Sequence, residues 1–287
     1  MTDRQSLFLY GGNMNFNTRE SVEEKLSEFA DEKYRLFTSR LTNTKYPILG
    51  VRIPQLQNLA KQILKGDYNA FLSLPFTYFE HHILRGMVIA MNKEGEKEHL
   101  SLFDEYIPYI DDWEGVDLIA SRYNCKTESY FSALRSRLNG DREYSVRFAL
   151  IAILHNFASD KTKAPAITGD VRDLTKRGYL EKFLRGAKER VRQNTGERLG
   201  GYIPASSPML TGTAAPPAGY YVMMGAAWLL SVLYLTDKAA VLDYVKDGSI
   251  DIDTRLKTIS KILDSFRVSK EEKQYLRILR GEIRQGK

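Results

Sequence analysis

The chain has 287 residues, of which 43% are hydrophobic and 27% charged, and a moderate net charge of +6, as is typical of a soluble globular protein. Its single cysteine, Cys125, excludes an internal disulfide, and its four histidines show no spacing typical of metal ligands. The longest largely apolar stretch, 225–235, falls far short of the roughly 18 residues that span a bilayer, and the first residues lack a signal-peptide core. We therefore expect a cytoplasmic protein.

From Ser21 onward, apolar residues recur with helical periodicity, and no segment has the alternation typical of a strand. The predicted helices span 20–40, 52–65, 67–73, 76–93, 96–107, 112–124, 127–138, 143–157, 171–194, 219–235, 237–247, 253–265 and 269–284. The fold class is therefore all-α. Because helix pairs recur roughly every 35 to 45 residues, we expect a HEAT-like helical-repeat solenoid.

One region interrupts this rhythm. Residues 196–219 are rich in glycine and proline, which favours a long loop, and they follow a basic helix. We expect a single solenoid domain over 1–287 in which the basic helix and the loop, about 160–218, form an insertion.

The positive charge is concentrated in two segments. Residues 170–198 hold nine Lys or Arg against five Asp or Glu, and residues 267–287 hold seven against three, so the two segments carry +8 together. Such clusters are typical of contact with a polyanion, and the alternative is that they are solvated helix faces.

Trp113 and Asp117 are four residues apart in a predicted helix, which puts an indole and a carboxylate on one face beside apolar residues. The alternative to a functional site is a carboxylate that bonds neighbouring backbone or pairs with a nearby arginine. Arg147 is a second anomaly, because it interrupts the apolar run from Val146 to Leu154. A guanidinium there is costly unless it is paired or faces a groove, so the three residues form a candidate site.

Several segments together resemble the AlkD-type DNA alkylation repair proteins. The run Tyr46-Pro47-Ile48-Leu49-Gly50-Val51-Arg52-Ile53-Pro54, followed by a helix from Gln55, looks like the opening segment of that family. Segments 110–117, 144–149 and 220–228 match the family in the same order, and 259–270 reads like its small Gram-positive branch. The resemblance covers about 25–158 and 219–280.

The resemblance implies a concave stack of HEAT-like helix pairs that binds duplex DNA, and a glycosylase for N3- or N7-alkylated purines that leaves the damaged base in the stack. Matched by position, Asp117 is the catalytic carboxylate, Trp113 and Trp228 are the indoles of the cleft, and Arg147 contacts the DNA backbone. We also expect DNA contacts from Tyr221, Lys45 and Arg52, although core packing is the alternative for Tyr221.

This interpretation predicts a monomeric, monofunctional enzyme that needs no metal or organic cofactor and whose partner is double-stranded DNA carrying alkylated bases. No lysine is placed to form a Schiff base with the sugar. Two departures favour an alternative, a non-catalytic HEAT-like module that binds branched or distorted nucleic acid or a protein: Met223 and Met224 stand where relatives often have lysine, and the 160–218 segment is long. His81 and His82 replace residues that are often acidic in relatives, and we assign them no role.

Overall fold

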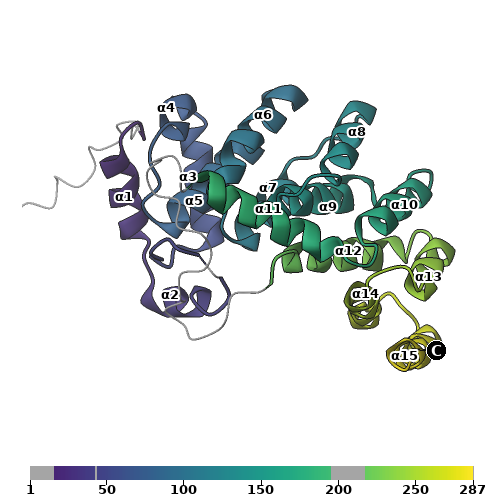
Figure 1. The fold of residues 1–287 in the computed structure, drawn as a ribbon. Helices are drawn as coiled ribbons and strands as arrows, with labels where there is room; N and C mark the ends of the chain where they lie inside the picture. Colours follow the sequence, from purple (N-terminus) through teal and green to yellow (C-terminus); the bar gives the residue numbers. More distant parts are fainter. Residues whose placement is uncertain (1–15, 43, 195–216, 287) are drawn as a thin grey trace, which may run out of the picture. The chain divides into compact units, whose positions relative to one another are not determined.

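The computed structural model describes residues 16–42, 44–194 and 217–286, with side chains omitted at 187–194. All regular elements in these ranges are helices, fifteen α-helices and one short 3-10 helix, which confirms the all-α prediction (Figure 1). Among these helices, none combines the length and the apolar character needed to cross a membrane. The chain divides after Lys93 into two compact units, which we describe separately.

Unit 1 is built around one buried helix. Its helices are α1 (Arg19–Glu28), α2 (Glu32–Thr38), α3 (Ile53–Ile63), α4 (Tyr68–Leu72) and α5 (Phe79–Met91). Every residue of α5 from Phe79 to Ala90 is buried, and α1, α3 and α4 pack against it. The predicted helix 20–40 is two helices, because the Asp31 side chain accepts the Tyr34 N–H at 3.1 Å and starts a new helix there.

The segment between α2 and α3 is held by a buried carboxylate. Glu80 accepts backbone N–H groups from Leu49, Gly50 and Val51 at 3.0, 2.6 and 3.2 Å. Gly50 has φ +87°, and a Cβ there would lie 2.3 Å from the Asp31 carbonyl oxygen. The motif at 46–54 therefore serves first to build this turn, which only glycine fits.

The two adjacent histidines of α5 belong to the core of unit 1. Both are fully buried beside the Phe76 ring, at centroid distances of 5.9 Å for His81 and 5.2 Å for His82. Burial and the nearby Arg85 charge lower the pKa of His81 to about 4 and that of His82 to about 3. Both rings are therefore neutral near pH 7.

Unit 2 contains the remaining helices. They are α6 (Glu96–Tyr106), the 3-10 helix η1 (Ile107–Tyr109), α7 (Trp113–Arg122), α8 (Glu128–Arg137), α9 (Glu143–Phe157), α10 (Ala164–Leu174), α11 (Tyr179–Asn194), α12 (Tyr220–Leu233), α13 (Lys238–Lys246), α14 (Ile252–Asp264) and α15 (Lys270–Arg284). Helices α7, α9, α12 and α14 form a row in which each packs against the next (Figure 1). Helix α8 packs on α9, and α13 packs on α12 and α14, so one helix of each pair belongs to the row, as in HEAT-like repeats.

The predicted helix 171–194 is also two helices. Helix α10 begins earlier, at Ala164 with a proline in its first turn, and the chain turns at Gly178, whose φ is +84°. The turn is fixed because Arg177 donates its backbone N–H to Ser249 at 3.0 Å. Helix α10 buries Ile167 and Val171 and packs on α12 and α13, and the insertion expected at about 160–218 stays a prediction. The expected loop falls largely on 195–216, outside the described residues.

Candidate functional site

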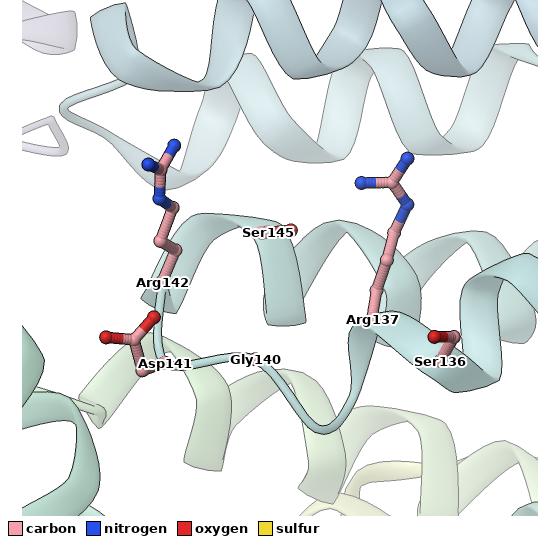
Figure 2. A pocket seen from close by; sticks show the side chains of 6 residues that line it. All are labelled: Ser136, Arg137, Gly140, Asp141, Arg142 and Ser145. Atoms are coloured by element: carbon pink, nitrogen blue, oxygen red, sulfur yellow. The ribbon is translucent and has the colours of Figure 1, made fainter.

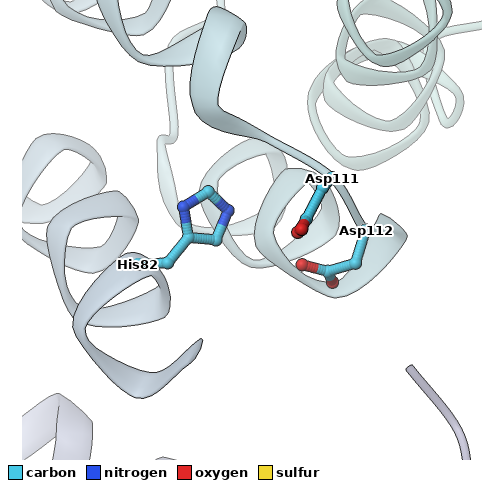
Figure 3. A group of neighbouring side chains, drawn as sticks. All are labelled: His82, Asp111 and Asp112. Carbon is cyan, nitrogen blue, oxygen red and sulfur yellow. The ribbon is translucent and has the colours of Figure 1, made fainter. Parts of the chain in front are cut away.

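Helix α7 presents two of the predicted site residues. Its first turn is capped by Asp112, whose side chain is drawn beside that of Asp111 in Figure 3. The Asp112 carboxylate accepts the N–H groups of Glu114 at 2.7 Å and Gly115 at 3.2 Å. Burial raises the pKa of Asp112 well above its ordinary value. Because the cap fixes Trp113 as the first helical residue, Asp117 follows one turn later on the same face. Both side chains are half-buried.

Arg147 of α9 holds Asp117 in a bidentate ion pair. Its Nε and Nη2 donate to the two carboxylate oxygens, each at 2.8 Å. Its Nη1 donates to the Tyr221 carbonyl oxygen of α12, also at 2.8 Å. The side chains of Arg147 and Asp117 are only 6% and 15% exposed. One guanidinium therefore links three neighbouring helices of the row.

This ion pair is the alternative to a functional site that the sequence left open for both Asp117 and Arg147. Each residue brings a charge into apolar surroundings, and each charge has the other as its partner. The contact between Arg147 and the DNA backbone stays a prediction. Burial raises the pKa of the Asp117 carboxyl above its ordinary value, and the Arg147 guanidinium opposes that rise. The Asp117 carboxylate therefore relies on Arg147 to stay ionised.

Trp228 of α12 contacts His155 of α9, a residue for which the sequence predicted no role. The His155 ring lies edge-on to the Trp228 ring at a centroid distance of 6.1 Å and an angle of 86°. His155 is exposed, and its charge interacts with that of Asp117. Burial lowers the pKa of His155, and Asp117 opposes this shift. The signal was available, because residues 147, 151 and 155 lie on one stripe of the predicted helix 143–157.

The start of α12 is fixed from α9. Glu143 accepts the Tyr221 N–H at 2.7 Å, and further bonds from the backbone of Gly219 and Val222 reach its carboxylate. Burial raises the pKa of Glu143, and these backbone bonds oppose the rise. Gly219 has φ +84° and provides no side-chain cap, so Glu143 replaces the usual capping residue.

Two tyrosines complete this anchor. The rings of Tyr144 and Tyr221 lie 5.7 Å apart, and the Tyr144 hydroxyl donates to the Asp111 carbonyl oxygen at 3.0 Å. The Arg147 guanidinium lies 5.8 Å from the centre of the Tyr221 ring, and burial raises the pKa of Tyr221 to about 12. The first turns of α7, α9 and α12 are therefore tied together beside Asp117. We call Trp113, Asp117, Arg147, Tyr221 and Trp228 the Asp117 site.

The other two predicted DNA contacts lie in unit 1. Lys45 is exposed, with its Nζ 5.2 Å from the centre of the Tyr46 ring. Arg52 pairs with Asp31 at 2.8 Å and lies over the Tyr34 ring. The Asp117 site belongs wholly to unit 2, so DNA contacts by Lys45 and Arg52 stay predictions.

The two methionines that stand where relatives often have lysine lie on α12. Met223 is buried, whereas Met224 is half-buried.

A surface hollow of about 270 Å³ lies at the turn between α8 and α9. Arg137 and Arg142 extend to the same side of it, and Asp141 extends to another (Figure 2). Its lining shares no residue with the Asp117 site.

A comparison with protein families matches residues 22–197 to the family described as DNA alkylation repair enzyme. The matched range contains Trp113, Asp117 and Arg147, and it ends before Tyr221 and Trp228. Searches of curated proteins and of solved structures gave no match.

Proposed function

The chain belongs to the family of DNA alkylation repair enzymes, and we propose that within this role it is a monofunctional DNA glycosylase. It hydrolyses the N-glycosidic bond of cationic alkylated purines, N3-methyladenine and N7-methylguanine, in duplex DNA. The observation that carries the proposal is the half-buried Asp117 carboxylate, held by Arg147 on the row of helices that also bears Trp113 and Trp228. The enzyme works as a cytoplasmic monomer without a metal or organic cofactor.

The proposed chemistry asks little of a general acid. Alkylation at N3 or N7 gives the purine a positive charge, so the base is already a good leaving group. As the bond breaks, positive charge develops on the deoxyribose, and a carboxylate near C1′ stabilises that charge and orients the attacking water. The reaction requires no pocket for a flipped base, and we propose that the base leaves from the stack.

The ion pair is compatible with this role by a count of hydrogen-bonding positions. An ionised carboxylate offers about four acceptor positions, and Arg147 uses two of those on Asp117. Two remain for the sugar and for water. A guanidinium has five N–H groups, of which Asp117 and the Tyr221 carbonyl take three. Arg147 can therefore hold the carboxylate and also donate to a phosphate beside the lesion.

The two indoles supply the second attraction for positive charge. Trp113 and Trp228 are half-buried, so each residue is partly exposed. An indole face attracts a nearby cation by roughly 0.5 to 2 kcal/mol, depending on how far the pair is removed from water. Such contacts favour both the alkylated base and the sugar cation that forms from it.

The test is Asp117→Asn, which keeps the shape and removes the charge. We expect release of N7-methylguanine from methylated duplex to fall by at least about tenfold to a hundredfold, or roughly 1.4 to 2.8 kcal/mol of transition-state stabilisation. N3-methyladenine, whose bond is weaker, is less affected. The matched control is Asp104→Asn, which removes a carboxylate that is 54% exposed and paired with Arg137 on the surface. Release of both bases at the wild-type rate by Asp117→Asn contradicts the proposal.

One observation favours a second function. Because Arg147 and Asp117 satisfy each other, they also suit a non-catalytic module that binds distorted nucleic acid through the same helices. The wild-type protein separates the two functions: binding of methylated duplex without release of either base assigns the module.

A further inference from the structure

The last helix carries a row of positive charges on one face. Lys270, Lys273, Arg277, Arg280 and Arg284 of α15 follow each other at spacings of three and four residues, which places all five on one stripe of the helix. Three apolar residues of the helix, Leu276, Leu279 and Ile283, are buried, and α15 packs against α14. We call the five cations the α15 stripe.

The α15 stripe has almost no partners of its own. Within the described residues, Lys270, Lys273, Arg277 and Arg284 make no ion pair, and Arg280 donates only to the Ser260 hydroxyl at 3.5 Å. Glu271, Glu272 and Glu282 fall on other faces at 100° per residue. Glu272 already pairs with Lys238 and caps the start of α15.

Such a stripe does not arise from the needs of folding. Like charges three or four residues apart on a helix repel by about 0.2 to 0.5 kcal/mol per pair, and the stripe holds four such neighbouring pairs. The helix dipole favours Arg284 in the last turn but disfavours Lys270 and Lys273 near the N-terminus. The stripe therefore lowers the stability of α15 unless a polyanion lies against it.

The shape of the stripe fits a linear polyanion. Fourteen helical rises separate Lys270 from Arg284, so the stripe is about 21 Å long with a cation about every 5 Å. This length corresponds to about six nucleotides along one strand of a duplex, where phosphates follow at 3.4 Å of axial rise. A membrane surface fits less well, because the exposed apolar residues of α15, Tyr275 and Ile278, lie far around the helix from the stripe.

We propose that the α15 stripe is a second contact of unit 2 with the duplex DNA backbone, outside the Asp117 site. The inference rests on the proposed function in taking DNA as the partner. It assigns the stripe to phosphates, so the contact adds affinity for any duplex and does not distinguish damaged from undamaged sequence.

The test is a triple variant, Lys273→Gln, Arg277→Gln and Arg284→Gln, bound to an undamaged duplex of about 20 base pairs at several salt concentrations. We expect the slope of log affinity against log salt to become shallower by about one for each phosphate that the variant no longer neutralises, up to about three. The matched control neutralises three exposed lysines elsewhere, Lys65→Gln, Lys97→Gln and Lys126→Gln, with the same change in net charge. We expect the control to keep the wild-type slope.

The outcomes separate this inference from the proposed function. A triple variant that melts at the wild-type temperature and keeps the wild-type slope overturns the inference, and so does an equal loss of slope in the control. If the triple variant loses binding to vesicles of anionic lipid but keeps its binding to DNA, the inference is also overturned, and the stripe is assigned to a membrane surface. Because the assay uses undamaged DNA, a shallower slope supports the stripe even if the wild-type protein releases no base.

Discussion

Replacement of Arg147 by methionine tests whether this residue holds the carboxylate or serves only DNA. The change leaves the Asp117 carboxylate, which is only 15% exposed, without its partner, and it removes the Arg147 donor from the Tyr221 carbonyl. Breaking a buried ion pair costs about 3 to 5 kcal/mol, and because water reaches part of Asp117 we expect about 3 kcal/mol of lost unfolding free energy. Urea denaturation measures this loss directly.

Two further variants make the measurement specific. Asp117→Asn combined with Arg147→Met leaves no unpaired charge, so we expect the double variant to be more stable than Arg147→Met alone. Arg135→Met breaks an exposed ion pair with Asp170, whose side chains are 42% and 23% exposed, and we expect a loss of at most about 1 kcal/mol.

The pH dependence follows from the sign of the pKa shift. Burial raises the pKa of Asp117 in the folded protein above its ordinary value of 3.8. Protonation of Asp117 therefore stabilises the fold fully below pH 3.8, and this contribution is lost as the pH rises through the raised pKa. Removal of Arg147 raises this pKa further. The cost of Arg147→Met is therefore largest near neutral pH and shrinks as the pH falls.

Base release adds a second readout. If Asp117 must be ionised, the acidic limb of the rate profile moves to higher pH in Arg147→Met. A variant that loses less than about 1 kcal/mol, keeps the wild-type acidic limb and only binds DNA more weakly would refute this reasoning. Arg147 would then serve only as a contact to the DNA backbone.

The other predictions concern the supports of the site and of unit 1. Glu143→Ala removes the acceptor for the first N–H groups of α12, so we expect a loss of about 1.5 to 3 kcal/mol in urea denaturation and a smaller loss for Glu143→Gln; equal losses would contradict this. Protonation of His155 quenches the neighbouring indole, so in a Trp113→Phe background the emission of Trp228 titrates with a midpoint below 6.5, because burial lowers the pKa of His155; a midpoint above 6.5 contradicts the contact. Gly50→Ala places a Cβ 2.3 Å from a backbone oxygen at φ +87°, so we expect a loss of more than about 2 kcal/mol or failure to fold, whereas Gly248→Ala, with nothing within 4 Å, stays near wild type.

The sequence predicted helices well where one periodic run has clear ends. The helix expected at 143–157 has those bounds in the structure. Errors arose where a helix stops and another begins without a break in periodicity. A single capping residue, Asp31, divides the first predicted helix, and the turn before Gly178 divides another. Caps and turns of this kind change the chain direction without changing the average pattern.

The candidate site was predictable as a set of residue types but not as a set of contacts. Asp117 and Arg147 are anomalies in their own helices, and this much can be read locally. Their pairing links residues 30 apart and depends on how α7 packs against α9. Glu143 looks like an ordinary acid in the first turn of a helix, so its bond to Tyr221, 78 residues away, has no local signal.

The anchoring of α12 has a consequence for how chains of this kind diversify. Its first turn is set by the Glu143 carboxylate of α9 and by Gly219, where a Cβ would lie 2.5 Å from Leu180 of α11. The position of Trp228, two turns further along α12, therefore depends on Gly219 and on its neighbours in α9 and α11. The connection between α11 and α12 can therefore change in length or sequence among related chains while Trp228 keeps its position. This junction is a place where an additional segment can be inserted.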